Sequence, residues 1–142
     1  MFFTRKEKKI LVIDDDLTLL KQIRARLENH EGVKVIEAID GEQGLIEANN
    51  HTPDLIILDW ILPGIQGTEV LVKLRTLQKT KHTQVLMLTG RNKIGDIEDV
   101  FELGANAYLT KPFSLKKLGE KVVEMLNSSN IKYIINNIRM PP

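Results

Sequence analysis

The chain has 142 residues, of which 42% are hydrophobic and 27% charged, a balance typical of one folded globular domain. Its formal net charge of +1 gives no overall attraction to nucleic acid or to an anionic membrane, so we expect neither as a direct partner. The absence of cysteine excludes disulfides and thiolate metal sites.

The amino-terminal residues read as a leader of mixed charge. Residues 1–8 contain too few apolar side chains for a signal peptide. No apolar run in the chain approaches the roughly 18 residues needed to cross a bilayer. These patterns predict a soluble protein with a cytoplasmic location.

Apolar runs and amphipathic stretches alternate from residue 9 to residue 126. Runs typical of buried strands lie at 9–13, 33–38, 54–58, 84–88 and 107–110. Apolar residues at helical spacing lie within 16–30, 40–50, 68–77, 96–103 and 114–126. Five strands alternating with five helices predict an α/β fold, in which a parallel sheet has right-handed crossovers and helices on both faces.

Composition also suggests where individual elements lie. The run 54–58 is the most apolar, so we expect it at the centre of the sheet, whereas 33–38 is more polar and expected near an edge. Asp15 or Asp16 is suited to cap the first helix, and Thr68 the third.

The character of the chain changes after residue 127. The stretch 131–138 is apolar but too short for a domain of its own. We therefore divide the chain into a leader (1–8), a main domain (9–127) and a carboxyl-terminal segment (128–142). The last segment is read as an extension of the final helix, a piece that packs on the body, or the start of a connector.

Chemically active side chains follow four of the predicted strands. Asp14 and Asp15 come after the first strand, Asp59 after the third, Thr89 after the fourth and Lys111 after the fifth. The carboxyl ends of parallel strands share one edge of the sheet, where open α/β sheets bind ligands. Grouped carboxylates are costly to desolvate without partners, and a bound cation is the simplest partner.

Magnesium suits this set of side chains. Mg²⁺ prefers about six oxygen ligands, including carboxylates, water and phosphate oxygens. The three aspartates carry −3, which Mg²⁺ and the Lys111 ammonium balance. Asp59 is the best candidate to accept a phosphoryl group, because it stands alone after the central strand. Thr89, Lys111 and the backbone N–H of Gly90 are placed to contact phosphoryl oxygens.

These segments resemble the receiver domain of two-component response regulators, of the chemotaxis type. The matching segments are Lys9–Asp16, Pro53–Asp59, Leu62–Gly64, Leu88–Gly90 and Gly104–Phe113. The resemblance implies a flavodoxin-like, doubly wound sheet in the order 2-1-3-4-5. It also implies a switch in phosphorelay signal transduction, rather than an enzyme acting on other substrates.

The resemblance also implies roles for individual residues. Asp59 would be the phosphoacceptor, and Asp14, Asp15, Asp59 and the backbone carbonyl of Ile61 would hold Mg²⁺, for which Mn²⁺ is a possible substitute. Thr89 and Lys111 would contact the phosphoryl group.

Further roles concern the switch. Thr89 and Tyr108 would be the switch pair, reshaping the surface of the fourth helix, fifth strand and fifth helix. The bond between Lys111 and Pro112 would be cis, as only X–Pro linkages readily allow.

The resemblance implies protein partners as well. The phosphoryl donor would be a histidine kinase or a histidine phosphotransfer protein, and the receiver of the signal an output domain or a downstream protein. A homodimer on phosphorylation is possible, although Asn106 and Ala107 replace an acidic pair common in receivers that dimerise through this surface.

Two other functions fit parts of the pattern. A phosphohydrolase with Asp59 as nucleophile would commonly carry a second acid two residues later, but Ile61 stands there. A degenerate receiver that only binds proteins would lack site residues, whereas every expected one is present.

Overall fold

The computed structural model describes residues 7–90 and 94–138, with side chains as far as residue 128. The strands are β1 (Lys9–Ile13), β2 (Lys34–Ala38), β3 (Leu55–Asp59), β4 (Gln84–Thr89) and β5 (Ala107–Thr110). The helices are α1 (Leu17–Glu31), α2 (Gly41–His51), α3 (Gly67–Thr76), α4 (Ile94–Glu102) and α5 (Leu115–Ile138). The predicted elements are thus all present, with ends that shift by a few residues except in α5, which ends twelve residues later than predicted.

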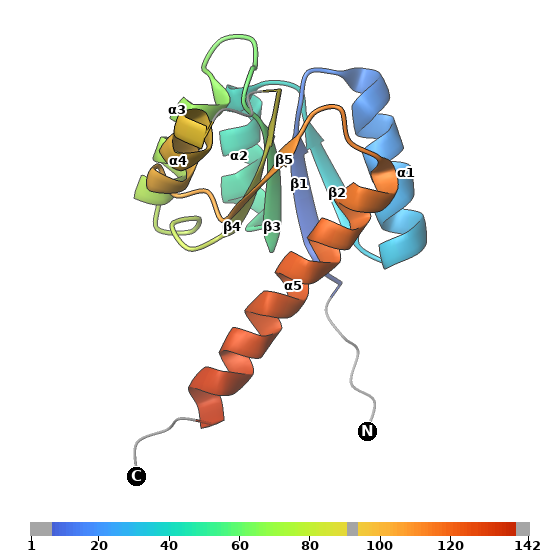
Figure 1. Ribbon diagram of the computed structural model, residues 1–142, viewed down its shortest axis with the longest axis vertical. Helices are drawn as coiled ribbons and strands as arrows, with labels where there is room; N and C mark the ends of the chain where they lie inside the picture. The colour runs from blue at the N-terminus through green and yellow to red at the C-terminus, as the bar shows by residue number, and fades with distance from the viewer. Residues whose placement is uncertain (1–6, 91–93, 139–142) are drawn as a thin grey trace.

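The five strands form one parallel sheet in the order β2-β1-β3-β4-β5. The most apolar strand, β3, lies in the middle and is buried at every residue, while the more polar β2 lies at an edge. Both placements and the doubly wound, flavodoxin-like order confirm the predictions. In Figure 1 the carboxyl ends of the strands lie towards the top of the molecule.

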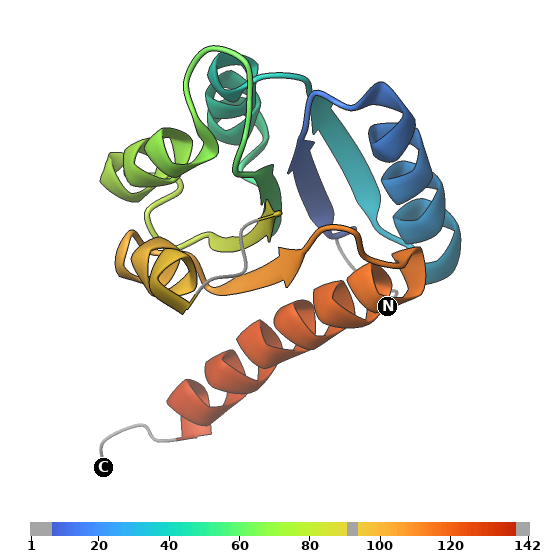
Figure 2. The same ribbon diagram turned by 45° about the horizontal axis from the view of Figure 1, so that its top comes forward.

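Helices cover both faces of the sheet (Figure 2). Alternate strand residues point to opposite faces, so each strand contributes to two hydrophobic clusters. One cluster joins the sheet to α1 and α5, through buried residues such as Ile23, Leu27 and Val122. The other joins it to α2, α3 and α4, through residues such as Leu71, Leu74 and Val100. This two-sided burial explains the continuous aliphatic runs in the sequence.

The side chains of Asp16, Asp40 and Ser114 accept hydrogen bonds from backbone N–H groups at the starts of α1, α2 and α5. The Asp16 carboxylate accepts hydrogen bonds from the N–H groups of Thr18 and Leu19, so Asp16 rather than Asp15 caps α1. The expected cap of α3 was wrong. That helix begins at Gly67, which puts Thr68 inside it and Gln66 at the cap position, with no side-chain cap bond.

The last helix continues past the change in composition after residue 127. Its backbone remains helical to Ile138, so the segment extends α5, as one of the three readings had it. In Figure 1 this helix runs well beyond the lower edge of the sheet. Among the described residues, no helix has the length and apolar character to cross a membrane.

A single arginine ties together the amino end of the sheet. The Arg75 guanidinium, near the end of α3, donates to the carbonyl oxygens of Thr80, Thr83 and Gly104 and to Oδ1 of Asn106 at 2.7–3.1 Å. Asn106 Oδ1 also accepts from the N–H of Val85 at 2.8 Å. These bonds join α3 to the loops before β4 and β5.

Candidate functional site

Three carboxylates meet at the carboxyl end of β1 and β3. The two strands pair in parallel, with Ile13 opposite Leu58, so the residues that follow, Asp14 and Asp59, lie side by side. Asp14 is fully buried, Asp59 is 7% exposed and Asp15 is exposed. One oxygen from each of the three carboxylates lies within 4.8 Å of the others. The structure therefore brings the predicted acids together.

Lys111 reaches into this cluster from the end of β5. Its Nζ donates to Asp14 Oδ2 at 3.0 Å and to Asp59 Oδ2 at 3.2 Å. Its backbone N–H donates to the carbonyl of Thr89 at 2.8 Å, which fixes the turn that follows β5. The bond between Lys111 and Pro112 is cis, as expected.

The cluster holds more negative charge than Lys111 can offset. Burial and, after it, the charge of Asp14 raise the pKa of Asp59 from 3.8 to about 6, although Lys111 and the N–H of Ile61 act in the opposite direction. Burial alone would lower the pKa of Lys111, but its hydrogen bonds to Asp14 and the charges of both carboxylates outweigh burial and raise it. When ionised, the three carboxylates carry −3 and the Lys111 ammonium carries +1, so the cluster lacks two positive charges.

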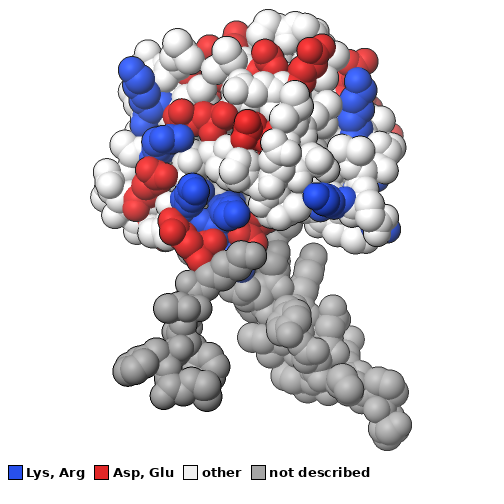
Figure 3. All heavy atoms as spheres, turned by 180° about the vertical axis from the view of Figure 1, so that it is seen from behind, with Lys and Arg blue, Asp and Glu red and all other residues white. Residues whose placement is uncertain are grey.

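Magnesium fits this donor set. Oxygen ligands about 2.1 Å from an octahedral ion are about 3–4 Å apart, close to the spacing of the three carboxylates. A divalent ion also supplies the two missing positive charges. The Asp59 carboxylate is oriented by the N–H of Ile61, 3.3 Å from Oδ1, which places the Ile61 peptide at the edge of the cluster. Red acidic side chains stand along the upper edge of the face in Figure 3, the end at which the strands finish.

Thr89 and Gly90 follow on the neighbouring strand. Leu88 pairs with Asp59 across the sheet, so Thr89 is one residue beyond the acceptor and is 1% exposed. A β-carbon added at Gly90 would meet no heavy atom of the described residues within 4 Å.

Tyr108 lies half-buried on β5, away from the acids. It is paired with Met87 in the sheet, and its ring packs edge-on against Phe101 of α4, with ring centroids 5.9 Å apart. Phe101 is 42% exposed, so the pair connects the sheet to the surface of α4.

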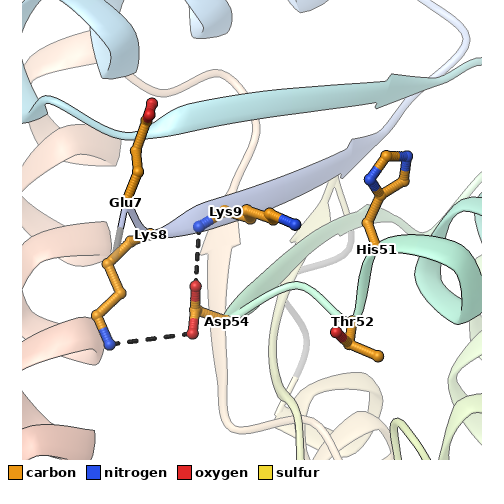
Figure 4. Close-up of a pocket in the computed structure, with 6 residues that line it drawn as sticks. All are labelled: Glu7, Lys8, Lys9, His51, Thr52 and Asp54. Carbon is orange, nitrogen blue, oxygen red and sulfur yellow. Dashed lines mark hydrogen bonds and ion pairs between the residues drawn. The ribbon is translucent and has the colours of Figure 1, made fainter. Parts of the chain in front are cut away.

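A second polar pocket lies at the opposite end of the sheet (Figure 4). It has a volume of about 80 Å³, and Asp54 is at its centre. The Asp54 carboxylate accepts from the N–H of Lys9 at 2.8 Å and pairs with Lys8 at 3.9 Å, which ties β1 to the start of β3. These contacts give Asp54 a structural role far from the acid cluster.

Sequence reasoning missed one residue close to the site. Gly67 begins α3 directly against the backbone of Asp59, and its N–H donates to the carbonyl of Trp60 at 2.8 Å. Many loops contain a glycine, so the sequence alone gives no reason to select Gly67. Its contact with the Asp59 backbone becomes evident only in the folded structure.

The fold and the site define a class: a doubly wound α/β domain with an acid triad and a lysine at the carboxyl edge of its sheet. The model of the family described as "Response regulator receiver domain" matches residues 10–123. The chain belongs to this family, and it is a receiver domain of two-component phosphorelay signalling. Phosphorylation on aspartate and binding of Mg²⁺ are general features of that family.

Individual proteins agree with this assignment. The chain is 41% identical over 124 residues to the alkaline phosphatase synthesis transcriptional regulatory protein PhoP of Bacillus subtilis, covering 87% of this chain and 50% of PhoP. It is 40% identical over 121 residues to the transcriptional regulatory protein CiaR of Streptococcus pneumoniae, covering 85% of this chain and 52% of CiaR. The chain therefore spans about half the length of these curated relatives.

Solved structures agree as well. A CheY-like response regulator receiver domain from Methanospirillum hungatei superposes with a TM-score of 0.82 at 31% identity, covering 89% of this chain and 99% of that one. The chemotaxis response regulator CheY4 of Vibrio cholerae gives a TM-score of 0.80 at 28% identity, covering 84% and 99%.

Proposed function

We propose that Asp59 of this receiver domain accepts a phosphoryl group from a phosphohistidine, with a divalent ion held by Asp14, Asp15, Asp59 and the carbonyl of Ile61. The observation that carries the proposal is the contact of Lys111 with both Asp14 and Asp59 inside the acid cluster. This contact places the Lys111 ammonium beside Asp59. The three carboxylates still carry more negative charge than Lys111 offsets, so a divalent cation is needed to balance them.

The transfer requires positioning more than covalent chemistry. A carboxylate oxygen of Asp59 forms a bond to phosphorus while the bond from phosphorus to the donor imidazole nitrogen breaks, and the imidazole leaves as the neutral base or takes up a proton. Mg²⁺, or Mn²⁺ in its place, supplies charge neutralisation for the phosphoryl oxygens when bound. Lys111 contributes a further positive charge, and Thr89 with the Gly90 N–H offers hydrogen bonds. The chain would thus catalyse only its own phosphorylation and dephosphorylation.

The switch would run from Thr89 through Tyr108 to the surface of α4. Thr89 is buried at the end of β4, next to the acceptor strand, and Tyr108 packs on the half-exposed ring of Phe101. A shift of Thr89 towards a phosphoryl group would leave room for Tyr108 to turn inward, and the surface of α4, β5 and α5 would change with it. Such a change is a shift in the populations of two states.

Partners follow from this assignment. The donor would be a histidine kinase or histidine phosphotransfer protein, and the signal would pass to an output domain or a downstream protein. The chain itself would act in the cytoplasm. A homodimer on phosphorylation is part of the proposal, through the same surface. Residues 9–127 would form the receiver domain, and 128–142 would extend α5 or begin a connector. The proposed leader at 1–8 lies mostly outside the described residues.

The experiment is phosphorylation by a small donor, acetyl phosphate, with Mg²⁺, read by intact mass. The wild-type chain should gain one phosphoryl group, and Asp59→Asn should gain none. Asp54→Asn is a matched control at the other end of β3 and should be labelled like the wild type, because the Asp54 carboxylate bonds to Lys8 and Lys9, far from the acid cluster. An unchanged wild-type mass, or equal labelling of Asp59→Asn, would sink the proposal.

A further inference from the structure

The first residue of α3, Gly67, lies in close contact with the backbone of the proposed phosphoacceptor, Asp59. The N–H of Gly67 donates to the carbonyl of Trp60 at 2.8 Å, which closes the loop between β3 and α3. A β-carbon added at Gly67 would overlap the carbonyl oxygen of Asp59 and lie 2.8 Å from the Cα of Trp60. Real β-carbons essentially never approach heavy atoms so closely, so something would have to shift.

The atoms in the way belong to the main chain. A flexible side chain can turn aside at little cost, but the Asp59 carbonyl belongs to the central strand and cannot move alone. The N–H of Trp60 bonds to the carbonyl of Leu88 on β4 at 2.9 Å, which holds the peptide from the other side. The peptides of residues 59–61 are therefore fixed between β4 and Gly67.

Space, not backbone conformation, requires glycine at this position. Gly67 is a helical residue, the first of α3, and any residue adopts that conformation. Gly64 in the same loop is the opposite case. Its φ of 75° is in the left-handed region, yet a side chain there would meet nothing within 4 Å.

We propose that Gly67 is a positioning residue for the divalent ion, because the absence of its side chain sets the place of the Asp59 carboxylate and the Ile61 carbonyl. The inference rests on the proposed function, in which both groups are ligands. The N–H of Ile61 holds Asp59 Oδ1 at 3.3 Å, so a shift of this peptide displaces both ligands together. Mg²⁺ demands near-ideal octahedral geometry, so a small displacement weakens binding.

The test is Mg²⁺ affinity of Gly67→Ala, measured by isothermal titration and by the fluorescence of Trp60. We expect affinity to fall about tenfold or more, equivalent to about 1.4 kcal/mol. Two glycines provide matched controls. Gly64→Ala strains the same loop without a contact, and Gly41→Ala meets side-chain atoms of Val70 and Ile65 at 2.5–2.6 Å. Both controls should lose stability yet bind Mg²⁺ within about threefold of the wild type.

A second measurement covers the case in which Gly67→Ala does not fold. In the wild-type chain, hydrogen exchange of the Gly67 amide should slow on saturation with Mg²⁺, since the ion fixes the peptides against which that amide bonds. If Mg²⁺ slows hydrogen exchange of the Ile61 amide but leaves that of the Gly67 amide unchanged, the inference is overturned. So would equal Mg²⁺ affinity of folded Gly67→Ala and wild type. If the wild type itself binds no Mg²⁺, the proposed function fails instead.

Discussion

The two ends of the sheet hold their half-buried cations in different ways. At the carboxyl end, Lys111 is bound by the carboxylates of Asp14 and Asp59. At the amino end, in the described part of the chain, Arg75 is bound by neutral oxygens, including the carbonyl of Gly104 and the amide of Asn106. Burial lowers the pKa of Arg75, whereas the acids raise the pKa of Lys111.

The difference separates a structural contact from a reactive one. Six hydrogen bonds join the Arg75 guanidinium to backbone carbonyls and to the Asn106 amide, groups that cannot change charge. The acid cluster around Lys111 has excess negative charge, and in the proposed function its members bind a metal and a phosphoryl group. The amino end therefore stabilises the fold, and the carboxyl end gives up stability for function.

The largest expected effect is at the amino end. Arg75→Met should lower the free energy of unfolding by about 3–4 kcal/mol, since several partly buried carbonyls lose their donor. Urea denaturation measures the change. Lys73→Met on the same helix is the control, and it should cost under about 0.5 kcal/mol because Lys73 is exposed. If Arg75→Met lowered the free energy of unfolding only slightly, the amino end could not be described as the stabilising end of the sheet.

At the carboxyl end, the stability of the metal-free protein should depend on pH through Asp59. The folded pKa of Asp59, about 6, is above its ordinary value of 3.8, so the folded state binds the proton more tightly. Asp59 then destabilises the metal-free protein above pH 6, and this penalty disappears as the pH falls towards 4. Integrated over that window it amounts to about 3 kcal/mol.

The comparison that isolates this effect uses Asp59→Asn. Denaturation of both proteins in chelator, from pH 7.5 to 4.5, should show wild-type stability rising relative to the variant as the pH falls. A constant difference between the two would mean that Asp59 titrates normally.

Magnesium should remove the same penalty at neutral pH. At a concentration 100 times its dissociation constant, a ligand adds about 2.7 kcal/mol to the free energy of unfolding. Asp15→Asn should reduce this gain, because Asp15 supplies one of the three carboxylates. Asp16→Asn is the matched control. Asn keeps the side-chain oxygen that caps α1, so Asp16→Asn should change basal stability little and leave the gain from Mg²⁺ intact.

The smallest effect is expected at the start of α3. Gln66 occupies the cap position without a cap bond, and its Nε2 instead donates to the Leu62 carbonyl over a long 3.4 Å. Gln66→Asp should cap the helix and raise the free energy of unfolding by about 0.5–1 kcal/mol in thermal or urea denaturation. Gln66→Ala should have little effect, and a loss of stability in Gln66→Asp would contradict the account of this helix end.

The sequence predicts more of the carboxyl end than of the amino end. Asp14, Asp59 and Lys111 each follow an apolar strand, so a parallel sheet is enough to bring them together. Arg75 carries no such signal, because its partners are backbone carbonyls that any residue could provide. Gly67 was missed for a related reason: its role depends on the Asp59 backbone, which only the packed loop brings near. The cap of α3 was wrong because Thr68 and Gln66 are two residues apart, within the usual uncertainty of a helix start.

Anomalous diffraction from crystals soaked in Mn²⁺ tests the central claim most directly. The account predicts one peak at the carboxyl end of the sheet, about 2.2 Å from oxygens of Asp14 or Asp15, Asp59 and the Ile61 carbonyl. A peak elsewhere, or none there at saturating Mn²⁺, would contradict it.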